Sequence, residues 1–150
     1  MTAHTSNARS GYEFAGFGRR VLGGAVGGAA GGIVFGAMMA MMGMLVMIAG
    51  MMGSSSPWVG FGIHMTISIF YGIVFTVLAT RWLGSWAKGL LVGAIYGIIL
   101  WVIGPLLIMP MMMGGALFAF NTTTMMSLIG HIIYGLVVAA VAIPMVRRRS

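Results

Sequence analysis

The sequence predicts an all-α membrane protein with four transmembrane helices, arranged as two tandem helical hairpins in a parallel repeat. Three observations predict this class: the composition, four long apolar runs, and a similarity between the two halves of the chain. Of the 150 residues, 60% are hydrophobic and only 6% are charged, and the mean hydropathy is +1.06. A soluble domain carries about a quarter charged residues. So few charges could not cover the surface of a soluble domain of this length.

We expect a polar cytoplasmic leader over residues 1–20 and a four-helix transmembrane domain over residues 21–150. A spanning helix needs about 20 mainly apolar residues, and four segments qualify, at about 21–52, 58–80, 87–113 and 123–146. The first run is longer than one crossing requires, which predicts a strong tilt or a glycine-rich start at the interface. The connections are short, so we expect sequential helices to pack as antiparallel neighbours.

The positions of the basic residues predict the orientation in the membrane. All eight occur in the leader, in the second connection or at the C-terminal end: Arg9, Arg19, Arg20, Arg81, Lys88, Arg147, Arg148 and Arg149. Loops rich in Lys and Arg stay in the cytoplasm, so both termini are expected there. The pI of about 11.3 does not indicate nucleic-acid binding, because the basic residues form no continuous polar face.

The two halves of the chain resemble each other. Gly23, Gly27 and Gly31 match Gly89, Gly93 and Gly97 at a shift of 66 positions, whereas Tyr71-Gly72 matches Tyr134-Gly135 at a shift of 63. Each half therefore reads as a helical hairpin that opens with a glycine-rich helix and closes with a helix carrying Tyr-Gly. Because each hairpin crosses the membrane twice, both begin on the same side, and a pseudo-two-fold axis along the membrane normal would relate them.

Rows of glycine indicate close helix packing. Small residues at four-residue spacing let helix backbones approach closely in lipid, and the chain has such rows at Gly24, Gly28, Gly32, Gly36, Gly89, Gly93 and Gly97. We expect the first and third helices to cross each other along these rows. The alternative is that the rows contact a second copy of the chain, so a homo-oligomer or other membrane subunits are the expected partners, beside the lipid bilayer.

Polar stripes on the second and fourth helices are the candidate core or ligand-binding residues. They have the same i, i+4, i+7 spacing, which places each set on one helix face: His64, Ser68 and Tyr71, then Ser127, His131 and Tyr134. The repeat aligns each histidine with a serine of the other half. If these two helices meet at the pseudo-two-fold axis, reciprocal His–Ser hydrogen bonds between them would satisfy all four groups.

The same histidines allow two alternatives based on metals. Two imidazoles in a helical core could bind a haem iron, and methionine thioethers favour Cu(I). The chain has 17 methionines, with M-x-x-x-M spacing at Met38/Met42, Met47/Met51 and Met109/Met113. Methionine also fills irregular gaps in apolar cores, and no cysteine or membrane-embedded carboxylate completes a ligand set. We therefore expect no cofactor and no metal site.

Two prolines should bend or break the third helix. Pro105 and Pro110 each remove a backbone donor and clash with the preceding turn. The corresponding part of the first helix contains Gly43 and Gly50 instead. Interrupted helices in membrane proteins often adjoin a transport site.

The second half resembles the YagU-type family of small bacterial inner-membrane proteins. The resemblance is carried by Trp86-Ala87-Lys88-Gly89-Leu90-Leu91-Val92-Gly93-Ala94, by Met109-Pro110-Met111-Met112 and by Ile129-Gly130-His131. It implies a multi-pass protein of the bacterial inner (plasma) membrane and implies no particular biochemistry.

The sequence contains no catalytic motif, so we expect no enzyme activity. We expect a non-catalytic integral membrane protein that packs with itself or serves as a subunit of a larger membrane complex. The alternative is a small transporter or channel with a site at the repeat interface, near His64, His131 and the interrupted third helix.

Overall fold

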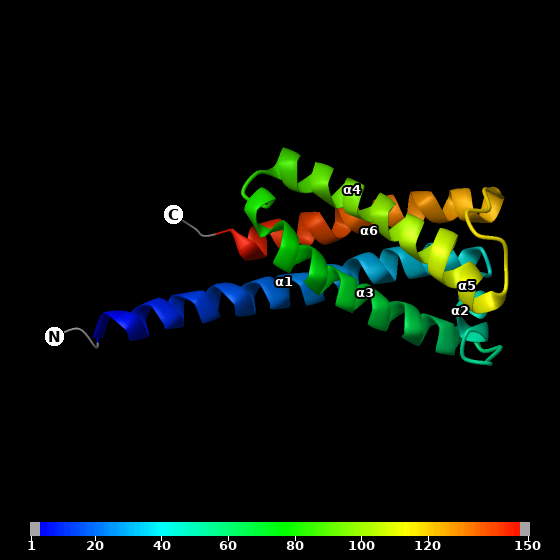
Figure 1. Ribbon diagram of the computed structural model, residues 1–150, viewed down its shortest axis with the longest axis horizontal. Helices are drawn as coiled ribbons and strands as arrows, with labels where there is room; N and C mark the ends of the chain where they lie inside the picture. Colours follow the sequence, from blue (N-terminus) through cyan, green and yellow to red (C-terminus); the bar gives the residue numbers. More distant parts are fainter. Residues whose placement is uncertain (1–3, 148–150) are drawn as a thin grey trace.

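The computed structural model describes residues 4–147, with side chains described from residue 16 onward. The described chain contains only helices and their connections (Figure 1). The elements are α1 (His4–Met41), α2 (Met44–Gly50), α3 (Pro57–Ala79), the 3-10 turn η1 (Thr80–Trp82), α4 (Trp86–Ile103), the π-helical turn η2 (Gly104–Ile108), α5 (Met109–Met113) and α6 (Thr122–Val146).

Four helical stretches are long and apolar enough to cross a membrane. They cover Gly16–Met41, Pro57–Trp82, Trp86–Met113 and Thr122–Val146. The start of α1, the connection between α3 and α4, and the end of α6 all lie at one end of the bundle (Figure 1). We call this the basic end, because Arg19, Arg81 and Arg147 lie there, and the opposite end the far end. The prediction of an integral membrane protein with four spanning helices is confirmed.

The first apolar run contains two helices. α1 begins at His4, so the polar leader and the first span form one continuous helix. α1 ends at Met41, Gly43 takes a left-handed conformation with φ of 70°, and α2 then begins at Met44. A left-handed residue cannot continue an α-helix. The run at about 21–52 is therefore not one continuous helix, because α2 takes up the length beyond one crossing.

The third span is interrupted where the prolines predict. α4 ends at Ile103, Pro105 lies in the π-helical turn η2, and Pro110 lies in the short helix α5. A proline removes the donor of an intrahelical hydrogen bond, and a π turn is one way to accommodate the loss. The interruption lies in the far half of the bundle, as does the break at Gly43.

The helices pack in the order α3, α1, α6, α4. α1 packs along both α3 and α6, and α4 packs along α6, whereas α3 makes only a few contacts with α4. The expected packing of each helix against its sequential neighbour therefore holds within each hairpin and fails for α3 and α4. A pseudo-two-fold axis would make the α3–α4 contact equal to the α1–α6 contact, so the assembled bundle departs from that symmetry.

One glycine row of α1 faces α3. A methyl group on Gly24 would lie 2.5 Å from the Cα atom of Ile73, and one on Gly28 would lie 2.9 Å from that of Ile69. Further along the row, Gly32 lies against Ser68, and Gly36 lies against the rings of Phe61 and His64. These distances leave no room for a side chain, so the row sets the close approach of the first hairpin.

The parallel row of α1 faces α6. A methyl group on Gly27 would lie 3.0 Å from the carbonyl oxygen of Val138, and one on Gly31 would lie 2.8 Å from the Tyr134 ring. The two rows thus place α1 between two helices, and α1 and α4 do not cross. The expected crossing of the first and third helices along their glycines was wrong.

The glycines of α4 face α6. A methyl group on Gly93 would overlap the backbone at Gly135, and one on Gly97 would overlap the backbone at His131. In the first hairpin, Gly24 and Gly28 meet the backbone at Gly72 and at Ser68 in the same way. Gly24 therefore takes the structural place of Gly93. The sequence repeat aligns Gly93 with Gly27 instead, so the two alignments differ by three residues, nearly one helical turn. The two hairpins share one kind of crossing in a different register.

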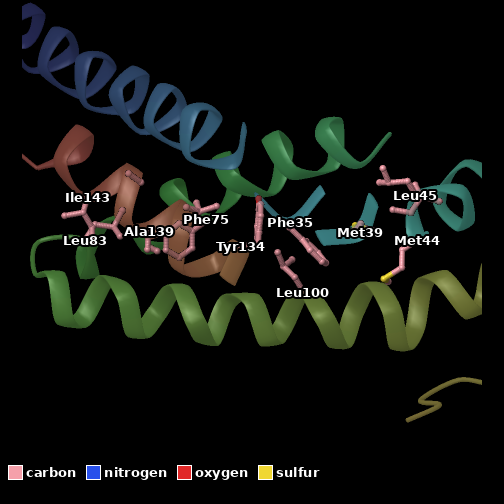
Figure 2. Close-up of a cluster of buried hydrophobic side chains, with 14 residues drawn as sticks. Phe35, Met39, Met44, Leu45, Phe75, Leu83, Leu100, Tyr134, Ala139 and Ile143 are labelled. Atoms are coloured by element: carbon pink, nitrogen blue, oxygen red, sulfur yellow. The ribbon is translucent and has the colours of Figure 1, made fainter. Parts of the chain in front are cut away.

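Large apolar side chains fill the basic half of the bundle. Figure 2 shows Ile143, Leu83 and Phe75 at one end of a row of buried side chains that continues through Tyr134 to Met39. Ile143, Leu83 and Phe75 are all completely buried. The bundle is therefore closed at its basic end.

Candidate functional site

A cavity of about 730 Å³ lies in the far half of the bundle, where α3 and α4 diverge. Small-molecule sites typically have volumes of about 300–1,000 Å³. All six residues of the two polar stripes line it, together with side chains of α1, α2, α4 and η2: His64, Ser68, Tyr71, Ser127, His131 and Tyr134. The structure thus brings together both sets of candidate residues at one site.

On α3, the His64 side chain is fixed by the backbone of α1. Its Nε2 atom lies 2.9 Å from the carbonyl oxygen of Gly32 and 3.5 Å from the hydroxyl of Ser68, one turn along its own helix. The glycine at position 32 lets α3 come close enough for this bond. Both polar side chains are buried.

On α6, the His131 side chain is fixed by its own helix. Its Nδ1 atom lies 2.8 Å from the carbonyl oxygen of Ser127 and 3.3 Å from the Ser127 hydroxyl. Each histidine therefore pairs with the serine of its own stripe. The expected reciprocal His–Ser bonds between the second and fourth helices do not form, because α3 and α6 make few contacts and α1 lies against both.

The phenyl ring of Phe35 takes the place between the stripes. Its ring centroid lies 5.4 Å from that of His64 and 4.8 Å from that of His131, with edge-to-face geometry in both pairs. Edge-to-face packing is favourable for aromatic rings. Phe35 lies over Gly130, where a methyl group would overlap the phenyl ring. Figure 2 shows the ring pointing towards the space between Tyr134, Leu100 and Met39.

Tyrosine hydroxyls connect α3 to the second hairpin. The Tyr134 hydroxyl donates to the carbonyl oxygen of Ser68 at 2.5 Å, and the Tyr96 hydroxyl donates to that of Tyr71 at 2.7 Å. Tyr96 also packs against Phe75, with ring centroids 5.0 Å apart. Tyr71 and Tyr134 line the cavity, whereas the Phe75–Tyr96 pair lies between α3 and α4 outside its wall.

Most of the remaining wall is apolar and flexible. Methionine thioethers contribute a large share, at Met39, Met44, Met47, Met51, Met109 and Met113. Methionine has an unbranched, polarisable side chain that adapts to irregular shapes. The wall can therefore adjust to the body of an apolar molecule.

The wall of the cavity combines neutral hydrogen-bonding side chains with apolar ones. Within the described part of the chain, no three residues of His, Cys, Asp or Glu come together. None of the described residues that line the cavity is charged. What the cavity offers is neutral hydrogen-bonding groups at its inner end and an apolar wall around them.

Sequence reasoning did not find Phe35, Gly130 or Tyr96. Phe35 is an isolated aromatic residue in a run of small side chains and methionines, and this contrast was the available signal. Tyr96 lies within the glycine row of α4, between Gly93 and Gly97, and no pattern there indicates a bond to another helix. Trp101, whose indole donates to the Thr124 carbonyl at 2.7 Å, likewise gave no signal.

Comparison with known proteins identifies no relative of this chain. No protein-family model matches the chain, no curated protein matches it, and no solved structure matches it. What the chain is shown to be is therefore an integral membrane protein with four apolar helices.

Proposed function

We propose that the protein binds a small, predominantly apolar molecule within the bilayer, as a non-catalytic binding or carrier component. The observation that supports this most directly is the cavity, which is lined by the residues of both polar stripes and otherwise mainly by apolar side chains. Of the two functions that the sequence suggests, the transporter-like one predicts a site beside His64, His131 and the interrupted third helix. The cavity lies at that position.

The rim of the cavity favours access from the lipid. Ile67 on α3 and Ile103 and Ile108 on the opposite side line the cavity and keep a large part of their side chains exposed. These side chains lie in the spanning stretches, where the surrounding solvent is hydrocarbon. A molecule dissolved in the bilayer would meet an apolar rim between α3 and α4.

The two ends of the bundle differ in a way that suits a carrier. The cavity begins at the level of the stripes and extends to Asn121 and Thr123 at the far end. Towards the basic end, the buried side chains of Phe75, Leu83 and Ile143 close the bundle. A carrier in one of its conformations exposes its site to one side only.

A photolabelling experiment tests the site. In lipid nanodiscs, a hydrocarbon carrying a diazirine should label cavity residues saturably, and excess unlabelled hydrocarbon should compete. Ile103→Trp, on the rim, is expected to weaken this labelling at least about tenfold, a loss of about 1.4 kcal/mol in binding free energy. Ile99→Trp is the matched control, because Ile99 is similarly exposed on α4 and does not line the cavity. Labelling that does not saturate, or that both variants weaken equally, would contradict the proposal.

We also propose the bacterial inner membrane as the location, with both termini in the cytoplasm. The basic residues occur in the leader, in the second connection or the first turn of α4, and at the C-terminal end, which supports this orientation. The chain has no cysteine, so single cysteines report topology directly. In intact cells, an impermeant maleimide is expected to react with Ser55→Cys at the far end and to spare Gly84→Cys at the basic end. The reverse pattern would invert the orientation.

Self-association, or assembly with other membrane subunits, remains a prediction. The glycine rows do not support it, because in this bundle they face α3 and α6 within the same chain. Membership of the YagU-type family remains a prediction too, and binding of haem or Cu(I) remains an alternative that the sequence leaves open. An absorbance spectrum and metal analysis of the purified protein would test for haem and copper.

A further inference from the structure

We infer that the cavity selects neutral amphiphiles whose polar end donates a hydrogen bond, that is, lipid-soluble alcohols and phenols. This inference rests on the proposed function and adds the chemical class of the bound molecule. It follows from which nitrogen of each histidine is left open to the cavity.

The open nitrogen of His131 is an acceptor. Its Nδ1 atom lies 2.8 Å from the carbonyl oxygen of Ser127, and a carbonyl oxygen only accepts, so Nδ1 carries the proton. In a neutral imidazole the other nitrogen then has a free lone pair. No described residue hydrogen-bonds to Nε2 of His131, yet every buried polar side-chain atom of the described residues has a partner. Nε2 is therefore accessible, and the cavity that His131 lines is the space it faces.

The same reasoning applies to His64 with the nitrogens exchanged. Its Nε2 atom lies 2.9 Å from the carbonyl oxygen of Gly32, so Nε2 donates and Nδ1 holds the lone pair. Among the described residues, none bonds to this Nδ1 atom, and it is not one of the buried polar atoms that lack a partner. Both histidines line the cavity, and both rings pack on Phe35.

The absence of charge in the described wall restricts the polar end of the bound molecule. A carboxylate or ammonium group would enter an apolar cavity without a counterion, which costs far more than burying a neutral hydroxyl group. A ketone, ether or hydrocarbon avoids that cost but leaves the imidazole lone pairs without a donor. A hydroxyl group donates to them and stays neutral, and the methionines accommodate the apolar body.

Competition between two matched molecules tests the selection. In the same nanodisc photolabelling, 1-dodecanol and dodecyl methyl ether differ in the donor while sharing the alkyl chain. After correction for partition into the bilayer, the alcohol is expected to compete at about tenfold lower concentration, the effect of one to two hydrogen bonds.

Two variants assign the preference to the histidines. The double variant His64→Leu and His131→Leu should lose the preference for the alcohol over the ether. The single variant His131→Gln, which retains an acceptor, should keep part of the preference, and it also provides a folded comparison if the double variant does not fold. Circular dichroism of each variant establishes that the bundle is intact.

The possible outcomes separate the two proposals. Equal competition by alcohol and ether, with saturable hydrocarbon labelling, overturns the selection of a donor and leaves the proposed site standing. A preference that survives in the double leucine variant also overturns it. No saturable labelling in the unmodified protein overturns the proposed function itself.

Discussion

Gly135→Ala is expected to destabilise the bundle strongly, because its new methyl group would occupy the position of the α4 backbone. That group would overlap the carbonyl oxygen of Gly93 and lie 3.1 Å from the backbone nitrogen of Gly97. A flexible side chain could move aside, but here two helix backbones must separate. Overpacking of a well-packed interior costs about 1–3 kcal/mol, and we expect a loss of unfolding free energy at the upper end of that range.

The measurement is unfolding of purified protein in mild detergent by increasing SDS, followed by circular dichroism. Gly62→Ala is the matched control, since a methyl group at Gly62 in α3 meets nothing within 4 Å. Alanine also has the higher helix propensity, so the control should be unchanged or slightly more stable. If the two variants unfold alike, α4 and α6 do not approach as closely as described.

Phe35→Ala is expected to cause the largest loss of stability among side-chain truncations in the site. The ring is 5% exposed and packs against both histidine rings, so its removal leaves a void between α1, α3 and α6. Replacement of a buried Phe by Ala costs about 3–5 kcal/mol. Phe70→Ala is the control, because Phe70 is 58% exposed, and it should cost much less in the same SDS titration.

A double variant tests whether Phe35 and Gly130 share one space. Gly130→Ala alone should destabilise the protein, because its methyl group overlaps the Phe35 ring. Once the ring is removed, the same methyl group has room. The double variant should therefore lose less unfolding free energy than the two single variants lose in total. Additive effects would mean that the ring lies elsewhere.

The divergence of α3 and α4 connects these stability arguments to function. Glycine rows bring α1 against α3 and α6, and bring α4 against α6. Between α3 and α4, by contrast, stand the rings of Phe75 and Tyr96. Three helix pairs are therefore held close while the fourth is held apart, and the space that remains beyond the aromatic pair is the cavity.

The sequence by itself determined the class, the number of spans and the interruption of the third span. Hydropathy over about 20 residues depends only on local composition, so the four spans could be placed from the chain alone. The break in the third span follows from the chemistry of Pro105 and Pro110. The two stripes could also be found, because i, i+4, i+7 spacing places residues on one face of any helix.

Only the tertiary structure decided which surfaces meet. A glycine row permits close approach to any helix, so the spacing could not show that one row of α1 faces α3 and the parallel row faces α6. The histidines are satisfied at one nitrogen by backbone carbonyls, at Gly32 and at Ser127, which no side-chain pattern indicates. The cavity exists because three helix pairs pack closely and one does not, and that difference is a property of the assembled bundle.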